Sequence, residues 1–146
     1  MDSFKVIQFN MQFGQGWDDA DPDGAPVDLD QTIAEIKRHD ADIVLLQEVE
    51  KALPNGKQIE PPVNYTRLRH ALPDYHGYFS YPKIDERELP FGIGLAILSK
   101  TPLYDPFRLE LPSPRLEFQF QGETKTPTDR LLIGAKTTIA EHEVQL

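Results

Sequence analysis

The sequence predicts one domain of the mixed α/β class, and three patterns lead to this expectation. Residues 43–46 are four large apolar residues in a row, which is typical of a strand buried on both faces beneath helices. A helical pattern over residues 29–39 precedes this strand, and a strand pattern over residues 4–9 precedes the helix. From residue 75 onward the pattern becomes β-like. A chain of 146 residues has room for one domain with a real core.

Residues 29–39 have the pattern of an amphipathic helix. Leu29, Ile33 and Ile36 fall on one face of it. Asp28 is expected to cap its N-terminus, and the three basic residues at 37–39 suit its C-terminal end. A strand, a helix and a strand in this order predict a right-handed parallel crossover.

Polar side chains stand where both strands of this crossover end. Asn10 follows the first strand, and Gln47 and Glu48 follow the apolar run. Because the C-terminal ends of parallel strands meet at one edge of a sheet, we expect Asn10 and Glu48 to be neighbours there. A carboxylate at the end of a buried strand is costly unless it is paired, and a hard divalent cation is a natural partner. The sequence therefore predicts one site at these two strand ends.

The remainder of the chain is expected to be mostly β-structure. A loop over residues 51–63 leads to Asn64, which is expected to cap a short helix ending at Leu72. Strands are then predicted, in chain order, over residues 75–81, 92–100, 103–109, 116–120 and 130–140. The last has the clearest alternation, with one face formed by Leu131, Ile133, Ala135, Thr137 and Ile139. A turn is predicted over residues 141–143, followed by the start of a return strand over 144–146. A return strand of so few residues suggests that the sequence is the front part of a larger protein.

Charge and composition narrow the classes of function and the location. The net charge is −9, and residues 1–60 hold 13 acidic residues against 5 basic ones. Such a field does not attract nucleic acid, although a local basic patch is compatible with it. No apolar run approaches membrane-spanning length, the N-terminus lacks a signal-peptide pattern, and there are no cysteines. We therefore expect a cytoplasmic chain with no membrane span.

Four segments in their order along the chain resemble a known family. They are residues 6–10, residues 41–48, residues 94–99, and Asp129-Arg130 at the start of the last long strand. This arrangement is similar to the endonuclease/exonuclease/phosphatase superfamily, which includes pancreatic-type deoxyribonucleases, abasic-site endonucleases, neutral sphingomyelinases and inositol polyphosphate phosphatases. The resemblance implies that residues 1–146 are the N-terminal part of one domain, truncated before its C-terminal half. The implied fold is the first half of a four-layer α/β/β/α sandwich with mixed, largely antiparallel sheets.

The resemblance also implies a role for several residues. Glu48 corresponds to the carboxylate that holds the catalytic Mg²⁺, for which Mn²⁺ can substitute, and Asn10 to the amide beside it that helps bind metal or phosphate. Arg130 corresponds to the arginine that contacts a substrate phosphate. Tyr81 and Ser80 lie on the loop that faces the site and would form its rim. The implied reaction is Mg²⁺-dependent hydrolysis of a phosphoric ester, with water attacking a metal-bound phosphate.

The rest of the family's machinery, a His-Leu motif, an Asp-x-Asn motif and a terminal Asp-His pair, is absent from this sequence. The four histidines, at positions 39, 70, 76 and 142, are expected to be structural or solvent-facing. We therefore expect the parent domain to be a metal-dependent phosphohydrolase and the 146-residue chain alone to be inactive. The alternative is a non-catalytic fragment or binding module with an unpaired strand edge at residues 130–140, through which the chain would self-associate.

The residues after Glu48 bear on the substrate. Val49 stands where abasic-site endonucleases often have lysine, and Glu50 where DNA-cleaving relatives often have a basic or neutral polar residue. Together with the net charge, they favour a small phosphorylated metabolite or a lipid headgroup over duplex DNA. Nuclease activity is the second alternative, because fold resemblance alone does not determine the substrate.

An acidic loop over residues 18–30 invites a further hypothesis. Asp19, Asp21, Asp23 and Asp30 match the oxygen-ligand spacing of a calcium-binding loop. No helix precedes the loop, prolines interrupt it at positions 22 and 26, and its twelfth position is Asp rather than Glu. We therefore expect a solvated acidic loop beside the site edge, with calcium binding as the alternative.

Overall fold

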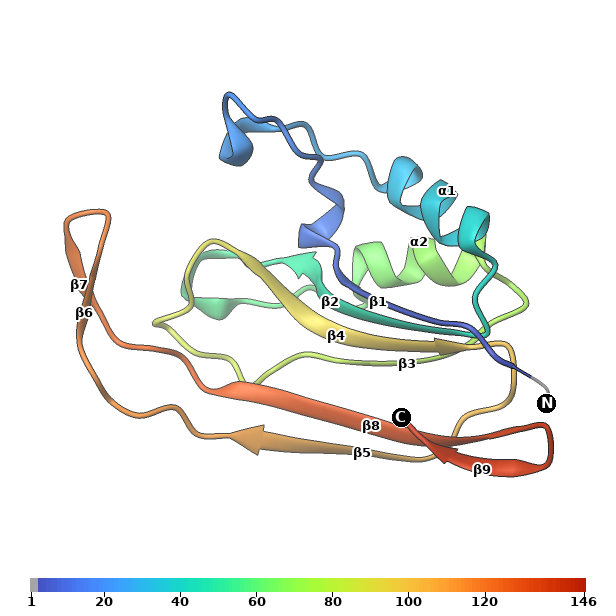
Figure 1. Cartoon of the computed structure of the whole chain (residues 1–146). Coiled ribbons are helices and arrows are strands. Elements are labelled where there is room, and N and C mark those ends of the chain that lie inside the picture. The colour runs from blue at the N-terminus through green and yellow to red at the C-terminus, as the bar shows by residue number, and fades with distance from the viewer. Residues whose placement is uncertain (1–2) are drawn as a thin grey trace.

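The computed structural model describes residues 3–146, apart from the side chain of Asp23. Figure 1 shows three layers: two helices lie over one face of a four-stranded sheet, and a three-stranded sheet lies beneath its other face. The larger sheet has, in spatial order, β1 (Val6–Asn10), β2 (Ile43–Lys51), β4 (Gly92–Ser99) and β3 (His76–Ser80). This confirms the α/β class with mixed sheets. The fourth layer of the implied sandwich stays a prediction.

The predicted crossover is present. β1 pairs in parallel with β2, from Val6 opposite Ile43 to Asn10 opposite Gln47. The connecting helix α1 (Leu29–His39) has the predicted bounds, and its buried residues join the main core. The Asp28 carboxylate accepts hydrogen bonds from the N–H groups of Asp30 and Gln31 at 3.0 and 3.2 Å, as its capping role requires. Such a cap contributes about 1 kcal/mol to helix stability.

The second helix, α2 (Val63–Ala71), begins differently from the prediction. It starts after Pro62, and the Asn64 side chain instead donates to the carbonyls of Phe13 and Val49 at 3.2 and 2.9 Å. A carboxylate from β2 serves the helix N-terminus, because the N–H of Tyr65 donates to Glu50 Oε1 at 2.8 Å. Burial raises the pKa of Glu50, and the hydrogen bonds from backbone N–H groups of α2 oppose this shift. The predicted Asn64 cap is therefore wrong.

The core lies between the helices and the larger sheet. β4 pairs antiparallel with both β2 and β3, so the sheet mixes parallel and antiparallel neighbours. Three of the four residues in the apolar run of β2 are buried and Leu45 is half-buried; Val44 and Leu46 pack in the core with α1, α2 and β4. Fully buried side chains from these elements include Ile36, Val44, Leu46, Leu68 and Leu98.

The smaller sheet has the order β5 (Tyr104–Leu111), β8 (Arg130–Ile139), β9 (His142–Gln145). All of its pairs are antiparallel. The return strand begins at His142 rather than at residue 144, so the predicted turn at 141–143 is wrong. Ala140 and Glu141 form the turn instead, with φ values of 47° and 66°, a two-residue hairpin with both residues left-handed.

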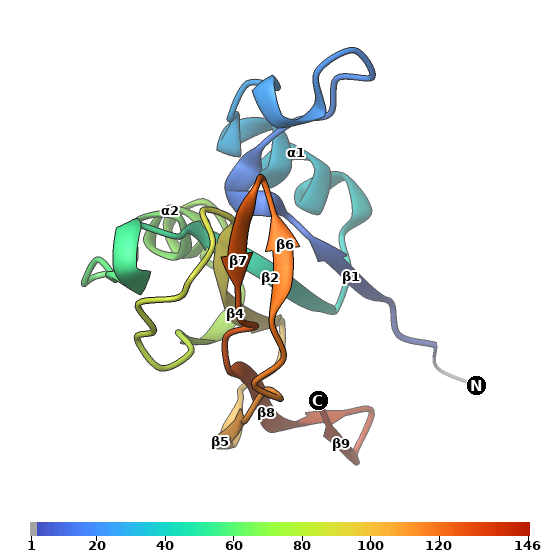
Figure 2. The same ribbon diagram turned by 90° about the vertical axis from the view of Figure 1, so that its left-hand side faces the viewer.

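Two projections stand at the end of the molecule where β1 and β2 terminate. One is the acidic loop between β1 and α1, and the other is a hairpin of β6 (Phe118–Phe120) and β7 (Glu123–Lys125) (Figures 1 and 2). The sequence prediction contained β6 but not β7. The ring of Phe120 contacts Phe91 edge-to-face at 5.7 Å between centroids, which ties the hairpin to the loop before β4.

The helices are short, with 11 residues in α1 and 9 in α2. None of the helices in residues 3–146 is both long and apolar enough to cross a membrane.

Candidate metal and phosphate site

Asn10 and Glu48 stand at the same edge of the larger sheet. Asn10 is the last residue of β1 and pairs with Gln47 of β2, and the next N–H, from Met11, donates to the Gln47 carbonyl at 3.0 Å. Glu48 follows Gln47 directly. The crossover therefore brings the two predicted residues to the same edge, but only Asn10 ends its strand: β2 continues to Lys51, so the predicted end of this strand at Gln47-Glu48 is wrong.

Glu48 occupies a bulge in β2. The register between β2 and β4 shifts between Gln47 and Glu50, and Glu48 has φ = 52°, in the left-handed region. A non-glycine residue there carries strain, and a bulge reorients the side chain at the edge of a sheet. Gly92 of β4 makes this conformation possible. A Cβ atom at Gly92 would lie 2.8 Å from Glu48 Oε2 and 3.0 Å from its Cα.

A cavity of about 290 Å³ joins Glu48 to the smaller sheet. Glu48 and Gln47 contribute from β2, Gly92 and its neighbours from β4, and Arg130 from the first position of β8. The structure thus brings Glu48 and Arg130 to one cavity. Asn10 stands at the adjacent strand end and does not line this cavity.

The guanidinium of Arg130 is bonded to neighbouring side chains through one nitrogen, while most of its side chain is accessible to solvent. Its Nη1 donates to Thr128 Oγ1 at 2.7 Å and lies 3.8 Å from Glu88 Oε1. Its side chain is nevertheless 64% exposed. A guanidinium fixed at one nitrogen with its other N–H groups accessible can bind phosphate oxygens in a bidentate manner.

Glu88 also lines the cavity, and the sequence analysis missed it. Its side chain is only 8% exposed. Burial raises the pKa of Glu88, while the positive charge of Arg130 and the hydrogen bond to Thr128 lower it by less. Glu88 lies in a charged loop with no periodic pattern, so nothing in the sequence distinguishes it from its solvated neighbours. Its burial arises from the packing of this loop against the segment before β8.

A side-chain clamp connects these two segments. Arg87 pairs with Asp85, donates from Nη1 to the Pro127 carbonyl at 3.0 Å, and approaches Asp129 at 3.9 Å. The hydrogen bonds from Arg87 hold the pKa of Asp85 at about 2. The carboxylate of Asp129 in turn accepts from the N–H of Ser113 at 3.0 Å. The clamp therefore joins the loop before β4 to the segment that leads directly into Arg130.

Comparison with protein families identifies the family of the chain. The sequence model of the Endonuclease/Exonuclease/phosphatase family matches residues 7–133. The chain belongs to this family. Its members are in general metal-dependent hydrolases of phosphoric esters.

Two solved structures of the endonuclease/exonuclease/phosphatase family share the fold. One, from Beutenbergia cavernae DSM 12333, is 19% identical, with a TM-score of 0.63 over 97% of this chain and 36% of its own. Another, from Leptotrichia buccalis C-1013-b, is 13% identical, with a TM-score of 0.60 over 98% of this chain and 53% of its own. The chain thus spans about a third to a half of these proteins. No curated protein sequence matches it.

The oxygen donors at the strand ends suit the divalent metal on which the family generally depends. Residues 3–146 contain no cluster of three or more His, Cys, Asp or Glu side chains that could hold a metal ion. Mg²⁺ keeps several waters and needs only one or two protein carboxylates, so Glu48 with Asn10 is a compatible donor set. Asn10 Oδ1 also accepts from the N–H of Gln12 at 2.9 Å, so Asn10 forms a turn as well.

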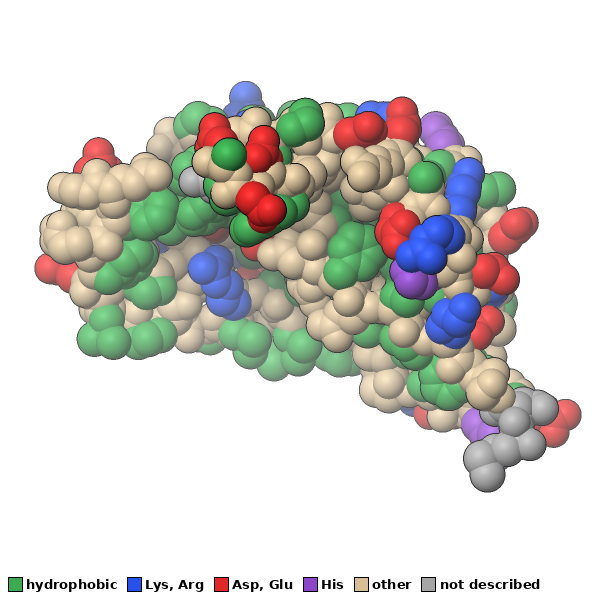
Figure 3. Space-filling model, turned by 45° about the horizontal axis from the view of Figure 1, so that its top comes forward, with side chains coloured by type: hydrophobic (Ala, Val, Ile, Leu, Met, Phe, Trp, Pro, Cys, Tyr) green, Lys and Arg blue, Asp and Glu red, His purple; other side chains and the backbone are tan. Residues whose placement is uncertain are grey.

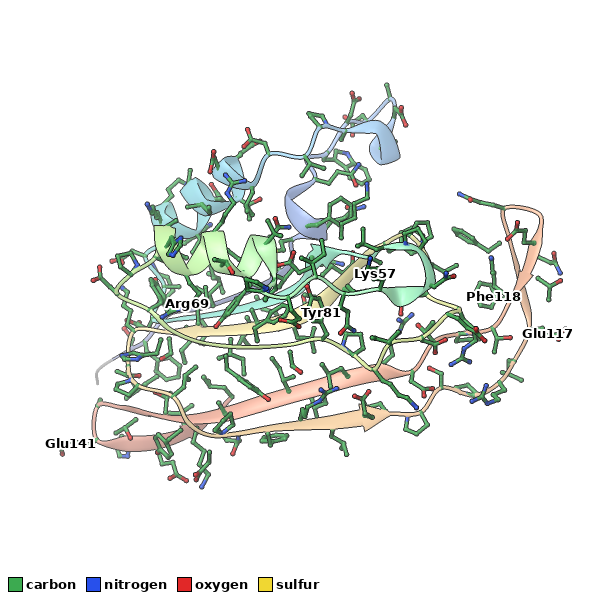
Figure 4. All side chains as sticks on the ribbon, turned by 180° about the vertical axis from the view of Figure 1, so that it is seen from behind. Lys57, Arg69, Tyr81, Glu117, Phe118 and Glu141 are labelled. Carbon is green, nitrogen blue, oxygen red and sulfur yellow. The ribbon has the colours of Figure 1, made fainter. Side chains whose placement is uncertain are left out.

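Tyr81 and Ser80 lie around a neighbouring cavity rather than the one that contains Glu48. Tyr81 stands near the end of β3, in the middle of the molecule (Figure 4). It is buried, and its hydroxyl donates to the Ile59 carbonyl at 3.1 Å. Burial, with the negative charges of Glu50 and Glu60, raises the pKa of Tyr81 to about 12. Tyr81 is therefore a protonated, structural residue at neutral pH.

The acidic loop forms a solvated surface near the site edge, where acidic side chains gather in Figure 3. Asp19 accepts from the indole N–H of Trp17 at 2.7 Å, and Asp21 accepts from the N–H of Gly24 at 3.1 Å. Asp30 lies in α1 and pairs with Arg67 of α2 at 2.7 Å. The side chain of Asp23, the remaining predicted calcium ligand, is outside the described residues. These bonds fit a solvated loop.

The histidines are remote from the Glu48 cavity. His39 lies at the end of α1, 3.2 Å from Glu35, and His70, His76 and His142 are exposed. The residues that line the cavity include no histidine.

Proposed function

We propose that the domain to which this chain belongs hydrolyses phosphoric esters with a bound divalent cation, Mg²⁺ or Mn²⁺. The observation that carries the proposal is the single cavity lined by both Glu48 and Arg130. In this proposal Glu48 and Asn10 hold the cation and Arg130 binds the phosphate.

Each residue would act through a property seen in the structure. Arg130 presents exposed N–H groups that would neutralise the non-bridging oxygens of a phosphate. Glu48 is fixed at a bulge by its close contact with Gly92, so its carboxylate is preorganised. A bound Mg²⁺ would supply Lewis-acid polarisation of the phosphate and a positioned water. The buried Glu88 would restrain Arg130 through their ionic contact.

The charge distribution supports a small substrate over duplex nucleic acid. The chain carries a net charge of −9, and the exposed acidic loop projects at the end of the sheet where Asn10 stands. A long polyanion would meet this loop, whereas a compact phosphate ester would reach Arg130 without doing so. We therefore infer a phosphorylated metabolite or a lipid headgroup as the substrate in preference to duplex nucleic acid.

Phosphate binding tests the proposal directly. Titration calorimetry with inorganic phosphate and Mg²⁺ should detect binding to the chain, and Arg130→Met should weaken it roughly tenfold or more, because a hydrogen bond to a charged group is worth about 1.5–3 kcal/mol. Arg115→Met is the matched control, since Arg115 is exposed and does not line the cavity. Equal affinities in wild type and Arg130→Met would contradict the assignment of Arg130.

A hydrolysis assay distinguishes an enzyme from the alternative, a non-catalytic binding module. The lack of histidine in the cavity favours the binding module for this chain alone. Cleavage of bis-p-nitrophenyl phosphate that requires Mg²⁺ and disappears in Glu48→Gln would identify an enzyme. Phosphate binding without cleavage would identify a binding module. Cleavage that survives in Glu48→Gln would exclude Glu48 from the reaction.

A further inference from the structure

The cavity that contains Glu48 and Arg130 is lined by more acidic than basic side chains. Glu48, Glu88 and Asp129 each contribute a carboxyl group, whereas Arg130 is the only cation among the described residues that line this cavity. A phosphate is itself an anion, so ionised carboxylates around it oppose its binding. Binding of phosphate here therefore requires that each of these carboxyl groups be neutralised.

Two of the three carboxyl groups have a neutralising partner. Asp129 accepts a hydrogen bond from the N–H of Ser113 at 3.0 Å and lies 3.9 Å from the guanidinium of Arg87. In the proposed function, Glu48 is neutralised by the bound cation. Glu88 remains, and its only cationic neighbour on this cavity is Arg130, the residue to which the phosphate would bind.

The contact between Glu88 and Arg130 is not a closed ion pair. Glu88 Oε1 and Arg130 Nη1 are 3.8 Å apart, which is longer than a hydrogen bond, and Nη1 donates instead to Thr128 Oγ1 at 2.7 Å. Thr128 is buried and is hydrogen-bonded in turn to Glu88. Because its hydroxyl accepts from Arg130, its own proton is available to Glu88. Thr128 thus connects the two charged groups while they remain apart.

A phosphate oxygen fits between these two groups. An oxygen about 2.7 Å from both Glu88 Oε1 and Arg130 Nη1 forms a triangle whose longest side is the observed separation of 3.8 Å. Nη1 carries a second N–H that can donate to this oxygen. Glu88 can approach the same oxygen only as a carboxylic acid, because an ionised carboxylate has no proton to donate and repels the phosphate.

The surroundings of Glu88 favour its protonated form. Its side chain is only 8% exposed, and this burial raises its pKa, whereas the charge of Arg130 and the hydrogen bond from Thr128 lower it by less. In the same loop, the charge of Asp85 raises the pKa of Glu88 and the charge of Arg87 lowers it. A bound phosphate adds a negative charge beside Glu88, so the pKa of Glu88 should rise further on binding.

We propose that Glu88 takes up a proton when a phosphate ester binds, and that the resulting carboxylic acid donates a hydrogen bond to a phosphate oxygen beside Arg130. Before binding, Glu88 is the anion that faces Arg130. On binding, the phosphate takes this place and the proton comes from solvent. Affinity for phosphate esters should therefore fall as the pH rises between the pKa of Glu88 in the free protein and its higher pKa in the complex. The inference rests on the proposed function, because the phosphate must lie at Arg130.

Proton uptake, measured by titration calorimetry in buffers of different ionisation enthalpy, tests the proposal. The probe is dimethyl phosphate with saturating Mg²⁺, since this diester does not titrate near neutral pH. Between about pH 5 and pH 8 the wild type should take up as much as about one proton per diester bound, and its affinity should fall by up to about tenfold per pH unit. Glu88→Gln, whose amide donates without titrating, should bind the diester with no proton uptake. Glu88→Met, which cannot donate, should bind it about tenfold more weakly than Glu88→Gln.

Two exposed acids provide the controls. Glu86 lies in the same loop as Glu88 and Glu117 lies just before β6, and neither lines the cavity, so Glu86→Gln and Glu117→Gln should take up protons as the wild type does. Diester binding without proton uptake in the wild type, or uptake that survives in Glu88→Gln, overturns this inference alone. A folded Glu88→Gln that binds no diester also overturns it. If the wild type does not bind dimethyl phosphate, the proposed function fails and this inference fails with it.

Discussion

At the scale of single residues, the site depends on one strained position and the glycine opposite it. Glu48 has φ = 52° in a bulge, and the absence of a side chain at Gly92 leaves room for it. The sequence predicted Glu48 and Asn10 because polar groups that end apolar strands are visible in the pattern. It could not predict Glu88, since that carboxylate is buried by contacts between segments far apart in the chain.

Adding one methyl group at Gly92 should disturb both stability and metal binding. Gly92→Ala places Cβ within about 3 Å of several Glu48 atoms, and overpacking of this kind typically costs about 1–3 kcal/mol. Urea unfolding should show this loss, and Mn²⁺ affinity should fall because Glu48 is displaced. Gly16→Ala is the control, since its Cβ would meet only the Pro26 carbonyl at 3.4 Å. Unchanged stability and metal affinity in Gly92→Ala would show that Glu48 does not require this space.

At the scale of elements, the sequence predicted a helix or strand correctly where the residues that determine it lie within that element. α1 and its Asp28 cap follow from periodicity and capping alone. The Asn64 cap failed because Glu50, from another element, serves the N-terminus of α2. β9 was misplaced because its turn uses left-handed Ala140 and Glu141, which are not strong turn residues. β7 was missed although its turn, Gln121-Gly122, contains a glycine with φ = 79°.

The Asp85–Arg87 clamp should stabilise the protein in a pH-dependent way. The folded pKa of Asp85, about 2, lies below its ordinary value, so its stabilisation is present above about pH 4 and is lost as the pH falls toward 2. Asp85→Asn should cost roughly 1 kcal/mol at pH 7, because solvent screening reduces the effect of the full pKa difference. Urea titrations should show the difference between the wild type and the variant shrinking as the pH falls from 4 toward 2. The exposed Asp74→Asn should have no such effect, and a penalty for Asp85→Asn that is equal at pH 7 and pH 3 would refute the ionic origin.

At the scale of the whole molecule, the exposed apolar surface is a sheet face rather than the predicted strand edge. β8 pairs with β5 over residues 130–136 and with β9 over residues 136–139. The open edge expected along residues 130–140 is therefore limited to the first residues of β8, on the side away from β5. The outer face of the smaller sheet instead exposes, from β5 and β8, Phe107, Leu109, Leu111 and Leu132. The sequence revealed the strands, but which face of β5 points outward depends on how the two sheets pack.

This face should drive self-association of the chain. Contiguous exposed apolar side chains promote contact between copies, so sedimentation velocity should show a concentration-dependent increase in mass. Leu109→Lys should shift the chain toward the monomer. Leu116→Lys, on an equally apolar and 67% exposed position outside this face, should leave the association unchanged. A monomer at all concentrations, or equal effects of the two variants, would argue against the face as the contact surface.

Mn²⁺ binding followed by electron paramagnetic resonance tests the proposed metal site directly. Wild-type chain should bind Mn²⁺, Mg²⁺ should compete for it, and Glu48→Gln should weaken binding about tenfold or more because it removes the only carboxylate in the proposed donor set. Glu117→Gln should retain the wild-type affinity. If Glu48→Gln binds Mn²⁺ as tightly as the wild type, the cation does not lie between Asn10 at the end of β1 and Glu48 in the β2 bulge, and the proposed metal site is wrong.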